Sequence, residues 1–150
     1  MNAHNPVGVI GAGSFGTAVA NALAHNAEVL LFSRKKETVE EINRTHVHLG
    51  VALSPRITAT NDLAELAHHC TLIFPIVPST SFRRMMHALA PYLRPHHIVI
   101  HGTKGFDLKD MEEDELNNPG IVVTRSQVRT MSEVVREESS VVRVGCLSGP

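Results

Sequence analysis

Short apolar runs alternate with longer segments of helical spacing along the chain. The apolar runs are typical of buried strands, and we predict strands at residues 7–10, 28–33, 56–60, 71–77, 97–100 and 141–144. Between these runs, apolar residues three and four apart share one face, which predicts helices. We expect these helices at residues 17–25, 37–43, 63–68, 79–93 and 126–138.

This order of elements predicts an α/β fold. A strand, a helix and a second strand form the repeating unit of a parallel sheet. We therefore expect a Rossmann-type, doubly wound, mainly parallel sheet with helices on both faces. A length of 150 residues fits one domain over residues 1–150. Pro75 lies within the fourth apolar run, and because proline lacks a ladder donor we expect a bulge or an early strand end there.

The helix predicted after residue 78 carries a long apolar stripe. Phe82, Met86 and Leu89 belong to this stripe, which we interpret as core. Either Ser79 or Ser81 is expected to cap the helix. Residues 83 and 84, both arginine, are placed on its solvated face.

A glycine motif directly follows the first predicted strand. The chain reads Gly11-Ala-Gly13-Ser-Phe-Gly16 and then enters an alanine-rich helix. This is G-x-G-x-x-G between a strand and a helix, the setting in which it binds a dinucleotide. Gly11 makes the turn, Gly13 admits a pyrophosphate, and Gly16 lets helix and strand pack closely. The alternative is a glycine turn that serves packing alone.

The end of the second predicted strand bears on the choice of cofactor. Proteins that bind NAD usually place Asp or Glu here, on the ribose 2′-hydroxyl. This chain reads Ser33-Arg34-Lys35-Lys36, and an arginine suits a 2′-phosphate through bidentate hydrogen bonds. We therefore favour NADP(H), with NAD(H) as the second choice. Alternatively, residues 34–36 form only the solvated start of the next helix.

A lysine between glycines follows the fifth predicted strand, in Gly102-Thr103-Lys104-Gly105. Open α/β sheets bind ligands beyond the carboxyl ends of their strands. Lys104 is therefore our best candidate for a substrate contact, and its alternative is an exposed turn lysine.

Composition excludes several classes of function. A net charge of −1 and 4% aromatic residues argue against nucleic-acid partners. No run approaches the about 20 apolar residues of a membrane helix, so we expect no membrane insertion. Two cysteines and an N-terminus without a signal-peptide pattern favour the cytoplasm.

We expect no metal, because no carboxylate or cysteine completes a site near His46 and His48. Residues 107–120 are acidic and are interpreted as a surface excursion.

Several of these motifs occur together in a fixed order. They are residues 11–18 with the glycine motif, Ser33-Arg34, Val77-Pro-Ser79, Gly102-Thr-Lys-Gly105 and Leu147-Ser-Gly-Pro150. Together they resemble the N-terminal domain of bacterial NAD(P)-dependent glycerol-3-phosphate dehydrogenases over essentially the whole chain. Two regions depart from that pattern: residues 107–120, which are longer and more acidic, and the loop at residues 46–53.

The resemblance implies reversible reduction of dihydroxyacetone phosphate to sn-glycerol 3-phosphate by NADPH, a step toward glycerophospholipids. It implies that Ser14, Phe15 and Arg34 contact the cofactor, that Lys104 lies beside nicotinamide and substrate, and that Gly149 touches substrate. We also place Ser33 and Pro78 in the cofactor site. The proton-transferring lysine of the family lies in a second, helical domain outside these 150 residues. We therefore expect the chain alone to bind cofactor and barely catalyse.

Three other interpretations stay open. One is another phosphosugar or 3-hydroxy-acid dehydrogenase of the same architecture, and a second is a non-catalytic nucleotide-binding module. A methyltransferase fits less well, because it needs an acid where Ser33-Arg34 stands. The resemblance also allows a homodimer for the full-length protein.

Overall fold

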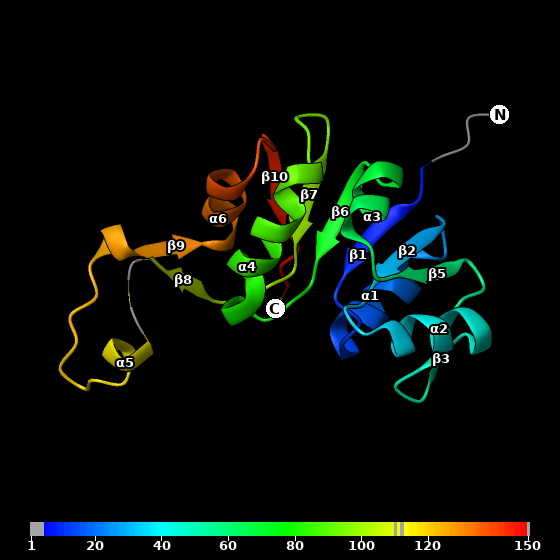
Figure 1. The fold of residues 1–150 in the computed structure, drawn as a ribbon, viewed down its shortest axis with the longest axis horizontal. Helices are drawn as coiled ribbons and strands as arrows, with labels where there is room; N and C mark the ends of the chain where they lie inside the picture. Colours follow the sequence, from blue (N-terminus) through cyan, green and yellow to red (C-terminus); the bar gives the residue numbers. More distant parts are fainter. Residues whose placement is uncertain (1–4, 110, 112, 150) are drawn as a thin grey trace.

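The chain folds around one parallel sheet, as seen in a computed structural model that describes residues 5–109, 111 and 113–149 (Figure 1). The strand order is β10-β7-β6-β1-β2-β5, and each neighbouring pair is parallel. The strands are β1 (Val7–Ile10), β2 (Val29–Phe32), β5 (Ile57–Thr60), β6 (Leu72–Pro75), β7 (Ile98–His101) and β10 (Arg143–Cys146). This confirms the predicted fold class, because the order reverses once, between β1 and β6.

Helices and two small hairpins complete the fold. The longer helices are α1 (Ser14–Leu23), α2 (Lys36–Thr45), α3 (Leu63–His69), α4 (Ser79–Leu89) and α6 (Met131–Glu138). Shorter helical segments are η1 (Ala90–Tyr92), α5 (Glu113–Leu116) and η2 (Arg125–Gln127). The antiparallel hairpins join β3 (Val47–His48) to β4 (Val51–Ala52), and β8 (Phe106–Leu108) to β9 (Val128–Thr130). In Figure 1 the β8–β9 hairpin and α5 project from the body of the molecule.

The central strands β1, β2 and β6 are largely buried, with helices covering both faces of the sheet, so they are apolar throughout rather than alternating. Neighbouring residues of β1 point to opposite faces: Val9 joins one core cluster and Ile10 the other. The Val9 cluster includes Ala20 of α1 and Ile42 of α2. The Ile10 cluster is larger and takes in α3, α4 and α6.

The starts of α3 and α4 and the end of β6 can be compared with the predictions. Asp62 caps α3 as an N-cap should, since its carboxylate accepts from the backbone N–H groups of Ala64 at 2.8 Å and Glu65 at 3.3 Å. The cap predicted for α4 is wrong, because its N-cap is Pro78 rather than Ser79 or Ser81. Strand β6 ends at Pro75, which confirms the early strand end.

The helix predicted at residues 126–138 is wrong in its first part. Residues 125–127 form η2 and 128–130 form β9, and the helix begins only at Met131. A capping box sets this start: Thr130 and Glu133 exchange hydrogen bonds between side chain and backbone, at 3.2 and 2.7 Å. Apolar spacing continues through the segment, so it could not mark the boundary.

Arg83 is not a solvated residue, contrary to the prediction. Its guanidinium bonds to three carboxylates: Asp107 of β8 at 2.8 Å, and Glu137 and Glu138 of α6 at 2.8 and 2.7 Å. Partial burial alone would lower its pKa, but these hydrogen bonds raise it. The side chain therefore joins α4 to the β8–β9 hairpin and to α6.

Candidate functional site

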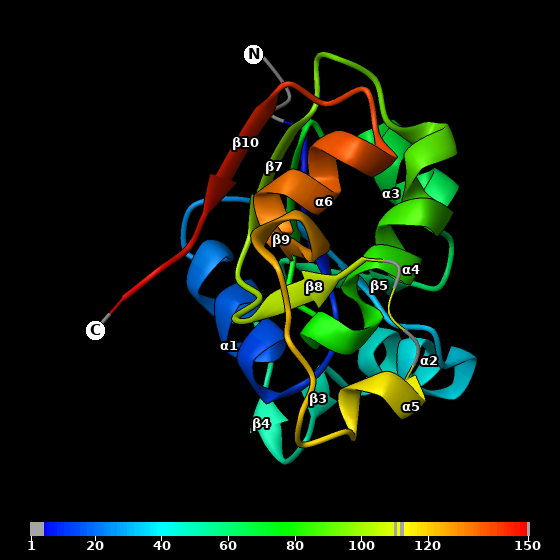
Figure 2. The same ribbon diagram turned by 90° about the vertical axis from the view of Figure 1, so that its left-hand side faces the viewer.

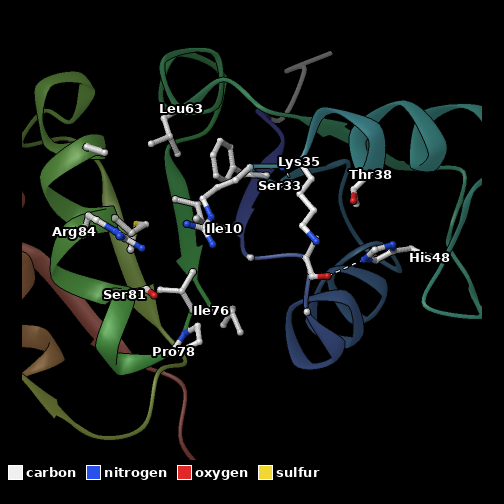
Figure 3. Close-up of a pocket in the computed structure, with 18 of the residues that line it drawn as sticks. Ile10, Ser33, Lys35, Thr38, His48, Leu63, Ile76, Pro78, Ser81 and Arg84 are labelled. Atoms are coloured by element: carbon white, nitrogen blue, oxygen red, sulfur yellow. Dashed lines mark hydrogen bonds between the residues drawn. The ribbon is translucent and has the colours of Figure 1, made fainter.

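An open cavity of about 570 Å³ lies at the carboxyl edge of the sheet, where the strand order reverses between β1 and β6 (Figure 3). Its floor is the glycine motif and Ile10. One wall comes from the segment after β2, and the opposite wall from the segment after β6 and from α4. This crevice is where doubly wound sheets bind their ligands.

The three glycines of the motif meet different surroundings. Gly11 has φ +117°, and a Cβ there would lie 2.1 Å from the Ile76 carbonyl oxygen. A Cβ on Gly16 would lie 1.8 Å from the Gly11 carbonyl oxygen, so both positions exclude any side chain. A Cβ on Gly13 would meet no described atom within 4 Å, and this glycine instead faces the open cavity.

The first turn of α1 is open toward an anion. Its N-cap is Gly13, which has no side chain to occupy the free backbone N–H groups, and the turn reads Ser-Phe-Gly-Thr without a carboxylate. Such a helix end attracts negative charge through these N–H groups and the helix dipole. The helix begins at Ser14, so Ser14, Phe15 and Gly16 form its first turn rather than a loop before it. The residues present fit a pyrophosphate.

The wall after β2 is polar and basic. Ser33 is buried, and its hydroxyl accepts from the Lys35 backbone N–H at 3.3 Å. Arg34 and Lys35 are exposed and line the cavity, while no Asp or Glu does so among the residues that the structure describes. Figure 3 shows Lys35 extending from this wall toward the glycine motif.

A second cavity of about 290 Å³ adjoins the first and shares Gly13 and Pro78 with it. Ser14, Phe15 and Lys104 line it, so the structure brings the first turn of α1 and the turn after β7 together. The Thr103 hydroxyl donates to the Val77 carbonyl at 2.6 Å and ties this turn to the segment after β6. Phe15 is 52% exposed, a large apolar ring left open at the cavity.

Comparison with known proteins assigns the chain to a family of dinucleotide-dependent dehydrogenases. The family described as the NAD-dependent glycerol-3-phosphate dehydrogenase N-terminus matches residues 6–150. The chain belongs to this family. It is 37% identical over 158 aligned residues to a glycerol-3-phosphate dehydrogenase (NAD(P)+) of Syntrophobacter fumaroxidans, covering 100% of this chain and 42% of that protein. It is 34% identical over 148 residues to the glycerol-3-phosphate dehydrogenase (NAD(P)+) 2 of Sphingopyxis alaskensis, covering 96% of this chain and 39% of that protein.

A solved structure agrees in fold. The crystal structure of glycerol-3-phosphate dehydrogenase from Coxiella burnetii superposes with a TM-score of 0.75 at 26% identity, covering 97% of this chain and 41% of that one. The chain therefore spans well under half the length of the relatives it matches. No helix among its described residues is long and apolar enough to cross a membrane.

One predicted site residue, Gly149, lies away from the two cavities that the other predicted site residues line. Gly149 is exposed, lies beyond β10 and lines neither cavity. In Figure 2 the chain after β10 runs outward from the sheet. Its predicted contact with substrate stays a prediction, and Pro150 of the same motif lies outside the described residues.

Sequence reasoning missed two residues that line the larger cavity. His48 of β3 forms a 2.7 Å hydrogen bond through Nε2 to the Ala12 carbonyl, which ties the β3–β4 hairpin to the glycine motif. Arg84 of α4 lines the wall opposite Arg34. No local signal marks either residue, since only the packing of distant elements brings them here. Within the described part of the chain, no group of three or more His, Cys, Asp or Glu could hold a metal ion.

His101 is the last residue before the turn that carries Lys104. It ends β7, its Nε2 pairs with the Ser132 hydroxyl at 3.0 Å, and its ring packs edge-on against Phe82. Burial lowers the pKa of His101, which favours the neutral form of the ring.

Proposed function

We propose that this chain is the cofactor-binding part of an NAD(P)-dependent glycerol-3-phosphate dehydrogenase that reversibly reduces dihydroxyacetone phosphate to sn-glycerol 3-phosphate. One observation carries the proposal: Gly13 faces open space at an uncapped helix N-terminus, in a family member matched over residues 6–150. The first turn of α1 then binds the pyrophosphate of the cofactor, with Gly11 and Gly16 holding its shape.

The preferred cofactor is NADP(H). Arg34 and Lys35 give the wall after β2 two positive charges, and Ser33 occupies the place of the acid that NAD-binding proteins usually carry. A guanidinium binds a 2′-phosphate by paired, charge-assisted hydrogen bonds. Pro78 stands where the two cavities join, beside the expected path of the nicotinamide half.

The smaller cavity takes the reacting end. A bound nicotinamide supplies the hydride. Phe15 offers a flat apolar surface there, and Lys104 offers an ammonium group that orients the substrate and stabilises negative charge on its oxygen. We assign no proton transfer to Lys104. A helical C-terminal domain outside these 150 residues completes the site with a proton-transferring lysine and, in our proposal, brings substrate to Lys104 and Gly149.

The substrate is a phosphorylated triose, and the protein acts in the cytoplasm without nucleic-acid partners. Free thiols at both Cys70 and Cys146 support a reducing compartment. Burial raises the pKa of the Cys70 thiol to about 12, so this cysteine is inert.

Replacing Arg34 by Glu tests the cofactor assignment. Calorimetric titration of the 150-residue chain should show NADPH binding more tightly than NADH. Arg34→Glu should reverse this order, because repulsion replaces the phosphate contact and a carboxylate accepts from the 2′-hydroxyl. Arg44→Glu is the matched control, since Arg44 is an exposed cation of α2 outside the cavity. Unchanged NADPH affinity in Arg34→Glu would refute the assignment.

Replacing Lys104 by Ala tests the catalytic assignment in the full-length enzyme. We expect the variant to lose about 2–4 kcal/mol of transition-state stabilisation, like the loss of one oxyanion donor. The ratio of kcat/KM for dihydroxyacetone phosphate between wild type and variant measures this loss. Lys104→Arg keeps the charge and should retain part of the activity. A kcat/KM for Lys104→Ala within a fewfold of wild type would reduce Lys104 to a turn residue.

A further inference from the structure

Arg84 faces the same cavity as Arg34 but from the opposite wall. It lies in the second turn of α4, beside Ser81 and Met85, which also line the cavity. Figure 3 shows its side chain directed from α4 into the space across from the strand that carries Ile10. The sequence pattern alone placed it on a solvated helix face.

The two neighbouring arginines of α4 are in opposite situations. Arg83 is bound by three carboxylates on β8 and α6. Arg84 is exposed and forms no ion pair or hydrogen bond with any residue that the structure describes. Adjacent residues of a helix point about 100° apart, so the fold directs one arginine into the network and the other into the cavity.

The cavity thereby collects positive charge without compensation. Arg34, Lys35 and Arg84 line it, and no Asp or Glu among the described residues does. Like charges that converge on one cavity repel one another, and a bound anion relieves that repulsion. The first turn of α1 already offers a place for the pyrophosphate, so the positive charge on the α4 wall is available to a further anionic group.

We propose that Arg84 is a specificity-determining residue that binds the 2′-phosphate of NADPH from α4, opposite Arg34. This inference rests on the proposed function, because it assumes that the adenosine end of the cofactor occupies the larger cavity. A planar guanidinium meets two phosphate oxygens at once, and a second arginine across the cavity would hold the phosphate between two walls. The competing role is stacking of the guanidinium on the adenine ring, which would serve NADH and NADPH alike.

The test compares affinities for NADPH, NADH and adenosine 2′,5′-bisphosphate, a probe that carries only the phosphorylated adenosine end. The variants of the 150-residue chain are Arg84→Ala, Arg84→Lys and the control Arg44→Ala, which removes an exposed cation outside the cavity. We expect Arg84→Ala to weaken NADPH and the bisphosphate about tenfold or more and NADH less than twofold. Arg84→Lys should recover part of the loss, and Arg44→Ala should change none of the three affinities.

Other outcomes overturn the proposal. Equal weakening of NADPH and NADH by Arg84→Ala would assign the arginine to a part shared by both cofactors, such as adenine. Unchanged affinities would show that it does not contact the cofactor. If the wild-type chain binds no cofactor, or does not favour the 2′-phosphate, the fault lies in the proposed function itself, since it precedes any substitution. Circular dichroism of each variant separates lost binding from lost folding.

Discussion

The glycines of the motif illustrate how residue type follows from local geometry. Gly11 and Gly16 are fixed by protein atoms, because a Cβ at either would lie about 2 Å from a backbone oxygen. Gly13 has an ordinary φ of −80° and open space before it, so nothing within the described protein demands glycine there. We infer that glycine is needed at position 13 to leave room for a ligand in the cavity, and not for packing against the protein.

This difference predicts opposite phenotypes for two single-methyl substitutions. Gly16→Ala should destabilise the chain by several kcal/mol or shift α1 away from β1, because its Cβ would meet a backbone oxygen at 1.8 Å. Gly13→Ala should leave the melting temperature within about 2 °C of wild type. It should nevertheless weaken NADPH binding at least tenfold, because its methyl group would occupy the space that we propose for the pyrophosphate.

Thermal denaturation and calorimetric titration of both variants check this pair. Normal NADPH affinity in Gly13→Ala would mean that the pyrophosphate does not lie over this glycine, and the glycine turn would then serve packing alone.

At the scale of elements, the most informative feature is the β8–β9 hairpin that replaces part of an expected helix. Val128 lies at helical spacing from Met131 and Val135, yet residues 128–130 pair with β8 instead. The helix start at Met131 depends on the Thr130–Glu133 capping box, whose backbone bond, together with Arg125, lowers the pKa of Glu133 to about 2. Strand pairing with β8 therefore prevailed over the helical spacing of apolar residues, and the capping box marks where α6 begins.

Arg83 holds this hairpin and α6 to the body of the domain. Hydrogen bonds from Arg129 and Arg83 lower the pKa of Glu137. Partial burial would raise the pKa of Glu138, but hydrogen bonds from Arg83 and His87 lower it overall. A carboxylate whose pKa is lower in the folded than in the unfolded chain stabilises the fold above its unfolded pKa, and this stabilisation is lost as the pH falls.

The melting temperature should therefore decrease as the pH falls below about 4.5, the ordinary pKa of a glutamate. Arg83→Met should lower it at pH 7 by about 2–8 °C, or roughly 1–2 kcal/mol, and should flatten the acid-dependent part of the profile. Arg84→Met on the adjacent position is the matched control and should change neither. A wild-type acid profile retained in Arg83→Met would mean that other carboxylates dominate acid stability. Differential scanning calorimetry from pH 7 to 3 measures both variants.

At the scale of the whole molecule, one reversal of strand order creates the site. From β1 the chain builds β2 and β5 on one side, then crosses to build β6, β7 and β10 on the other. The two segments that leave the sheet at this reversal, after β1 and after β6, diverge and leave the crevice between them. The larger cavity therefore collects residues from β1, β2, β3 and α4, which are distant in sequence.

The sequence by itself determined the six strands of the parallel sheet, the fold class, the glycine motif and the positions of Arg34 and Lys104 at strand ends. These features depend on local spacing, on backbone conformations open only to glycine, and on the rule that parallel strands end at one edge. Only the tertiary structure decided which arginine of α4 enters the cavity, that His48 reaches the glycine motif, and that residues 128–130 form a strand. Each of these depends on contacts between elements far apart in the chain, for which periodicity within one segment carries no information.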